Sequence, residues 1–118
     1  MKKCFIRLDA TSSLGFGHLM RCLAISYKLK ADFDVIFVVK GVESRNKLDE
    51  YDLRIIQITE NNCEEDFLLS LASNNPNAIW IIDTKKQFDE KFLPNLKKNC
   101  DVVLLIENLS KNMECADG

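Results

Sequence analysis

The sequence lacks the long hydrophobic run that a membrane helix requires: its longest, Val35 to Val39, is far short of about 20 residues. Arg7 and Asp9 interrupt the apolar stretch near the N-terminus, so no signal-peptide core forms there. An excess of basic residues is also missing, because 16 Lys and Arg stand against 18 Asp and Glu. This balance argues against nucleic acid or anionic lipid as a partner. We therefore expect a cytoplasmic protein without a membrane span.

Metal and disulfide signatures are missing as well. The five cysteines are odd in number, widely spaced and never arranged as Cys-x-x-Cys: Cys4, Cys22, Cys63, Cys100 and Cys115. This spacing argues against a zinc site and a disulfide framework, and it favours buried thiols in a reducing compartment. We expect neither a metal nor another cofactor.

Short apolar runs alternate with longer amphipathic stretches along the chain. We expect strands at Lys3–Asp9, Asp34–Lys40, Arg54–Ile58, Ala78–Asp83 and Asp101–Glu107. Two of these runs are apolar at consecutive positions, which is typical of strands buried on both faces of a parallel sheet. Helical spacing favours helices over residues 19–27, 67–72 and 88–96, with a short helix in residues 41–52.

This alternation predicts a Rossmann-like α/β fold, an open parallel sheet of about five strands with flanking helices. No internal repeat and no linker rich in Gly, Pro or Ser divides the 118 residues, so we expect a single domain over residues 1–118.

The junction between the first strand and the first helix carries the strongest functional signal. Gly15-Phe16-Gly17-His18 opens the helix, where backbone N–H groups favour an anion or developing negative charge. The residues at this junction match neither of two known phosphate-binding motifs. Met20 stands where a dinucleotide fingerprint needs its third glycine, and Gly-His-Leu replaces the Gly-Lys-Ser/Thr of a P-loop.

His18 is the only histidine in the chain. The dipole at a helix N-terminus disfavours imidazolium, and a neutral imidazole can take a proton from water as a general base. The alternative is that His18 caps the helix or fills the loop, and position alone does not choose between the two.

Asp9, Arg21 and Asp83 also have two interpretations each. Arg7 and Asp9 share a face of the first strand, so a mutual ion pair is favoured for Arg7, while Asp9 at the strand end is open to a functional role. Arg21 could contact a sugar or phosphate, or be solvated on the helix face. Asp83 ends the fourth strand and could bind substrate or cap the following loop.

The run from Ile6 to Leu23 resembles the opening of the UDP-sugar hydrolases of pseudaminic acid biosynthesis and of related spore-coat polysaccharide proteins. The shared pattern is Arg-x-Asp-x-Ser/Thr followed by Ile/Leu-Gly-x-Gly-His-x-x-Arg-x-Leu. The positions that match are Arg7, Asp9, Thr11, Gly15, Gly17, His18, Arg21 and Leu23.

The resemblance implies a function. Such enzymes have two lobes of the GT-B type, and this chain would be the N-terminal lobe, without the C-terminal nucleotide-binding domain. His18 would activate the water that hydrolyses a UDP-linked diacetamido-trideoxy sugar, with inversion and without a metal. The substrate would contact Asp9, Thr11, Gly15, Phe16, Gly17, Arg21 and Asp83.

Two loops depart from this pattern. Thr84-Lys85-Lys86 stands where the family commonly has a His or Tyr, and Glu107-Asn108 replaces paired aspartates. A second hypothesis therefore stays open, in which the chain is a non-catalytic module that binds a sugar nucleotide or a protein partner within a larger protein.

Overall fold

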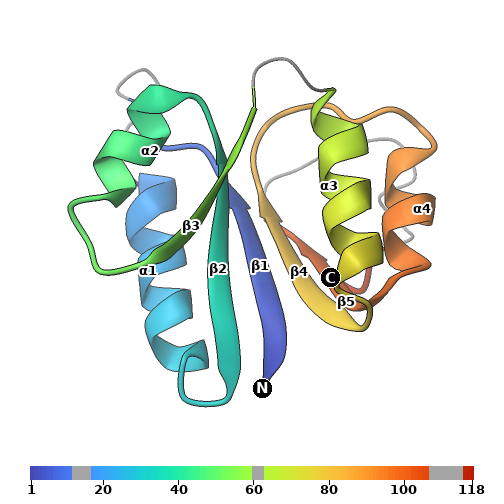
Figure 1. Cartoon of the computed structure of the whole chain (residues 1–118), viewed down its shortest axis with the longest axis horizontal. Coiled ribbons are helices and arrows are strands. Elements are labelled where there is room, and N and C mark those ends of the chain that lie inside the picture. Colours follow the sequence, from blue (N-terminus) through green and yellow to red (C-terminus); the bar gives the residue numbers. More distant parts are fainter. Residues whose placement is uncertain (12–16, 60–62, 107–115) are drawn as a thin grey trace.

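The computed structural model describes residues 1–11, 17–59, 63–106 and 116–118. Strands and helices alternate along the chain (Figure 1). The elements are β1 (Lys2–Leu8), α1 (Gly17–Leu29), β2 (Phe33–Lys40), α2 (Val42–Leu48), β3 (Arg54–Ile58), α3 (Glu64–Asn74), β4 (Ala78–Asp83), α4 (Phe92–Lys97) and β5 (Cys100–Leu105).

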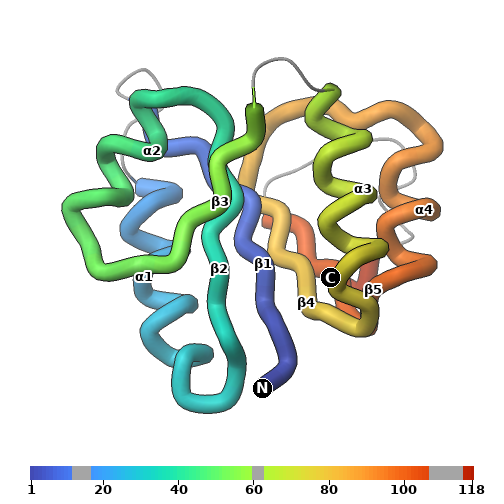
Figure 2. Tube along the Cα trace, in the orientation of Figure 1, coloured from blue at the N-terminus to red at the C-terminus, as the bar shows by residue number. Residues whose placement is uncertain are grey.

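The five strands form one all-parallel sheet in the order β3-β2-β1-β4-β5. The chain builds outward from β1 through β2 to β3, then crosses back to place β4 on the other side of β1 (Figure 2). This order matches the first five strands of the Rossmann sheet, and the predicted Rossmann-like α/β fold is confirmed.

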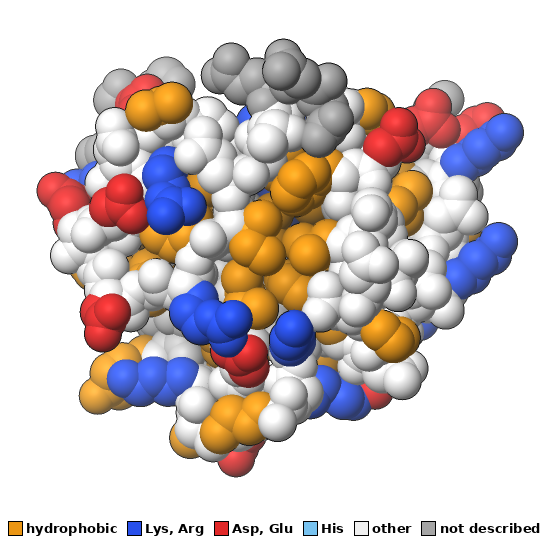
Figure 3. All heavy atoms as spheres, viewed as in Figure 1, with side chains coloured by type: hydrophobic (Ala, Val, Ile, Leu, Met, Phe, Trp, Pro, Cys, Tyr) orange, Lys and Arg blue, Asp and Glu red, His pale blue; other side chains and the backbone are white. Residues whose placement is uncertain are grey.

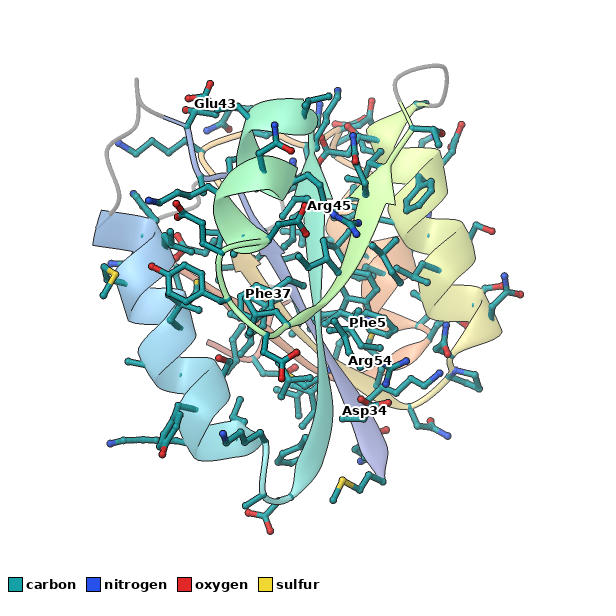
Figure 4. The ribbon with its side chains drawn as sticks, turned by 60° about the vertical axis from the view of Figure 1, so that its left-hand side comes forward. Phe5, Asp34, Phe37, Glu43, Arg45 and Arg54 are labelled. Carbon is teal, nitrogen blue, oxygen red and sulfur yellow. The ribbon has the colours of Figure 1, made fainter. Side chains whose placement is uncertain are left out.

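Each face of the sheet has its own hydrophobic core. The side chains of β1 alternate between them: Cys4, Ile6 and Leu8 pack on the side of α1 and α2, whereas Phe5 packs on the side of α3 and α4. Phe5 and Phe37 accordingly lie on opposite faces of the sheet (Figure 4). Burial on both faces explains the continuous apolar runs of the sequence.

The face beside α3 is less completely covered toward β3. Hydrophobic side chains gather between β3 and α3 in the space-filling view (Figure 3). Ile56 and Leu71 are among the partly buried residues that pack against this core. No helix in the described part of the chain is long and apolar enough to cross a membrane.

The expected element boundaries need small corrections. Strand β1 ends at Leu8, so Asp9 lies just beyond it, and β5 begins one residue before Asp101. Phe88 is buried but precedes α4, and Pro94 sits in the first turn of that helix, where its missing N–H has no intrahelical partner to lose. Glu107, the predicted end of β5, lies outside the described residues.

Candidate functional site

The candidate site lies at the carboxyl ends of β1 and β4, where the strand order reverses. Leu8, the last residue of β1, is in register with Asp83, the last residue of β4. Asp9 therefore leaves the sheet beside Asp83, as expected if the first and fourth strands are neighbours. Ligands of open α/β sheets bind at this kind of switch point.

His18 and Asp83 form the central contact of the site. His18 is the second residue of α1, and its Nδ1 lies 2.6 Å from Oδ1 of Asp83. Nη2 of Arg21, one turn further along α1, lies 2.8 Å from the same ring nitrogen and 3.0 Å from the same carboxylate oxygen.

Nδ1 of His18 has two contacts that a neutral ring cannot satisfy at once, because the guanidinium of Arg21 only donates and the carboxylate of Asp83 only accepts. We assign the proton to Nδ1, since the 2.6 Å contact with Asp83 is the shorter of the two and Arg21 has both oxygens of Asp83 as acceptors. With Nδ1 protonated, the basic lone pair of a neutral imidazole is on Nε2. A carboxylate that orients an imidazole in this way is the arrangement that supports general-base catalysis.

The carboxylate of Asp83 is fully buried and has several donors. Besides His18 and Arg21, it accepts a hydrogen bond from Sγ of Cys22, 3.1 Å from Oδ2. Burial and the carboxylate both raise the pKa of the Cys22 thiol, which keeps it protonated as a donor. Both oxygens of Asp83 therefore contact side chains of α1, an arrangement suited to orienting the His18 ring.

A second set of contacts fixes Asp9. Its Oδ1 accepts a hydrogen bond from Nη1 of Arg7 at 2.8 Å, and its Oδ2 accepts one from Oγ1 of Thr84 at 2.7 Å. The N–H of Ala10 donates to Oγ of the buried Ser44 in α2, 2.9 Å away, which ties the chain after β1 to its neighbour. Asp9 is therefore held in one orientation, with 22% of its side chain exposed.

Arg7 completes this set through a buried ion pair with Glu64, the first residue of α3. Its Nε lies 3.0 Å and its Nη2 3.2 Å from the two carboxylate oxygens, and both side chains are almost fully buried. Burial alone would lower the pKa of Arg7, but the hydrogen bonds and charges of Glu64 and Asp9 raise it above its ordinary value. The predicted Arg7–Asp9 pair is present.

No pattern in the sequence predicts that Glu64 belongs to this network. An acidic residue at the start of α3 has an ordinary explanation in the helix dipole, and 57 positions separate it from Arg7.

A small recess connects the two sets of contacts. It is lined by Asp9, His18, Asp83, Thr84 and Lys85, and its volume of about 10 Å³ is roughly that of the space one water molecule needs. The recess is far too small for a nucleotide, so a larger ligand has to lie over its mouth. Water beside His18 is what general-base hydrolysis requires.

The other predicted site residues are placed as follows. Gly17 begins α1, and a Cβ added to it would meet no atom of the described residues within 4 Å. Thr11 is half-buried and does not line the recess. Gly15 and Phe16 lie outside the described residues. Thus His18, Asp9, Arg21 and Asp83 come together around the recess, and Thr84 joins them without having been predicted.

A larger groove, of about 460 Å³, lies at the opposite edge of the sheet. It includes Asp34 and Arg54, which form an ion pair at the amino ends of β2 and β3 (Figure 4). The groove has no histidine and no buried carboxylate, and strand amino ends are not where ligands of this fold bind. The smaller recess contains His18 and the buried carboxylate of Asp83, so we assign the candidate site there.

Comparisons of the chain with protein-family models, with curated proteins and with solved structures gave no match. The resemblance to the UDP-sugar hydrolases rests on the motif around His18 alone. Within the described residues, no group of three or more His, Cys, Asp or Glu side chains is arranged to hold a metal ion.

Proposed function

We propose that this chain is the base-carrying lobe of an enzyme that hydrolyses a nucleotide sugar, with a UDP-linked diacetamido sugar as the substrate. The observation that supports this most directly is the 2.6 Å contact between Nδ1 of His18 and Asp83, because it directs the basic nitrogen of a neutral ring to Nε2. The motif around His18 supports the choice of substrate.

In the proposed reaction, Nε2 of His18 takes a proton from water as the water oxygen attacks the anomeric carbon. The bond between that carbon and the diphosphate oxygen breaks, and UDP leaves with the bonding electron pair. Asp83 keeps the ring oriented and stabilises the imidazolium that forms. Asp9, with both oxygens held, is suited to accept a hydrogen bond from a sugar hydroxyl or amide N–H.

The proposal includes a second lobe. The recess buries no more than a water-sized volume, whereas sites for small ligands are typically several hundred Å³. A partner lobe facing the carboxyl edge of the sheet would enclose the nucleotide and exclude bulk water.

The test is UDP release from UDP-sugars by the natural polypeptide that carries this chain. We expect His18→Ala to lower kcat by roughly 10²- to 10⁴-fold, the usual contribution of a general base. Asp83→Asn should cause a loss of similar order, because the amide no longer fixes the tautomer. Lys28→Ala, at the far end of α1, is the matched control and should leave kcat unchanged.

Turnover that survives His18→Ala would exclude this residue as the base. Binding of the nucleotide sugar with no turnover by the wild type would instead favour the non-catalytic module. Circular dichroism of each variant separates a lost base from a lost fold.

A further inference from the structure

The carboxylates that line the recess are each neutralised by a neighbouring arginine. Asp83 pairs with Arg21 at 3.0 Å, and Asp9 pairs with Arg7 at 2.8 Å. Glu64, the third carboxylate of the network, is bound by Arg7 and also lies 3.9 Å from Nζ of Lys40. These three carboxylates, all within the described residues, therefore contribute little net negative charge to a ligand that approaches the recess.

Lys85 stands apart from this balanced set. It lines the recess beside His18 and Asp83, its side chain is exposed, and among the described residues it forms no ion pair. Within the described part of the chain, no carboxylate balances its positive charge. An ammonium group with three donors on a flexible stem is a good partner for phosphate oxygens.

We propose that Lys85 binds a phosphate group of the ligand that lies over the recess, and so selects for a phosphate ester at this site. Within the proposed function, on which this assignment of the ligand rests, that group is the diphosphate that departs from the anomeric carbon. Lys85 also belongs to the run Thr84-Lys85-Lys86, where the sequence departs from the motif it resembles, which commonly has a His or Tyr after the fourth-strand aspartate. Lys85 therefore adds a charge preference that the resemblance does not supply.

The test is a titration of the 118-residue chain with inorganic pyrophosphate at physiological salt. Binding is monitored by the amide signals of residues 84–86 in ¹H–¹⁵N NMR spectra. We expect saturable shifts of these signals. Lys85→Ala should weaken binding roughly three- to tenfold, as expected for an exposed charged contact. Lys85→Arg should retain binding, and Lys85→Glu should abolish it. Lys98→Ala, an exposed lysine that follows α4, is the matched control and should have no effect.

Three results would overturn the proposal: no shifts at residues 84–86, unchanged affinity in Lys85→Ala, or tighter binding of glucuronate than of pyrophosphate. The last would assign a carboxylate in place of a phosphate. UDP and pyrophosphate are titrated separately, to show whether the nucleoside adds to the affinity.

The outcome is distinct from that of the hydrolysis assay. Pyrophosphate binding that depends on Lys85, without UDP release by the parent polypeptide, supports the phosphate site and refutes the hydrolase. UDP release without such binding supports the hydrolase and refutes the phosphate site.

Discussion

Removing the carboxylate of Glu64 tests the buried ion pair that links α3 to the candidate site. Glu64→Gln keeps the size of the side chain and one accepting oxygen but removes the negative charge beside the buried guanidinium of Arg7, which keeps Asp9 and the carbonyl of Leu8 as partners. Breaking a buried ion pair from one side costs about 3–5 kcal/mol of unfolding free energy. Because Arg7 keeps two of its partners here, we expect the lower end of that range, about 3 kcal/mol.

The control is Asp66→Asn, in the same first turn of α3. Both substitutions remove one negative charge near the helix N-terminus, and this common effect is about 0.3–1 kcal/mol. Asp66 is exposed, whereas Glu64 is buried. The difference between the two variants therefore reports the ion pairs of Glu64, of which the pair with Arg7 is buried and the 3.9 Å contact with the exposed Lys40 is not.

Urea unfolding followed by tryptophan fluorescence measures both variants. The single tryptophan, Trp80, is fully buried in β4 and stacks on Phe5 with ring centroids 4.8 Å apart, so its emission reports loss of the core. Equal unfolding free energies for Glu64→Gln and Asp66→Asn would refute the argument that the Arg7–Glu64 pair is buried and structurally essential.

Two further predictions concern other parts of the chain. Burial raises the pKa of the Cys22 thiol, whereas Cys63 is exposed. Iodoacetamide should therefore modify Cys63 in the folded chain and Cys22 only after unfolding. Mass spectrometry of the alkylated peptides measures this, and modification of both cysteines at the same rate in the folded chain would contradict it. The hydrogen bond from Arg54 lowers the pKa of Asp34, so this pair contributes stability at neutral pH that is lost as the pH falls through the lowered value. Asp34→Asn should flatten that part of the stability–pH curve, and an unchanged curve would show that the pair contributes nothing.

The sequence predicted the fold well because its strongest patterns are local. Consecutive apolar residues such as those of Val35 to Val39 are dictated by burial on both faces of the sheet, and the alternation with helices restricts the topology. The start of β5 at Cys100, one residue before the predicted Asp101, was missed because element boundaries depend on contacts that a short window does not contain.

The site was predicted in part. The resemblance and the strand ends singled out His18, Asp9 and Asp83, and the structure brings them together because β1 and β4 are neighbours. The roles of Glu64 and Thr84 depend on which side chains meet across the sheet. These contacts join residues 57 and 75 positions apart, and no pattern along the chain encodes them.

The tautomer of the His18 ring is the most direct test of the central claim, that Asp83 orients His18 as a base. Long-range ¹H–¹⁵N NMR spectra of the labelled chain, recorded under conditions where imidazole is neutral, identify the protonated ring nitrogen. We expect a proton on Nδ1 and a basic Nε2 in the wild type, and loss of this preference in Asp83→Asn. A wild-type ring protonated on Nε2 would contradict this assignment, because the nitrogen assigned to take the proton from water would already carry one.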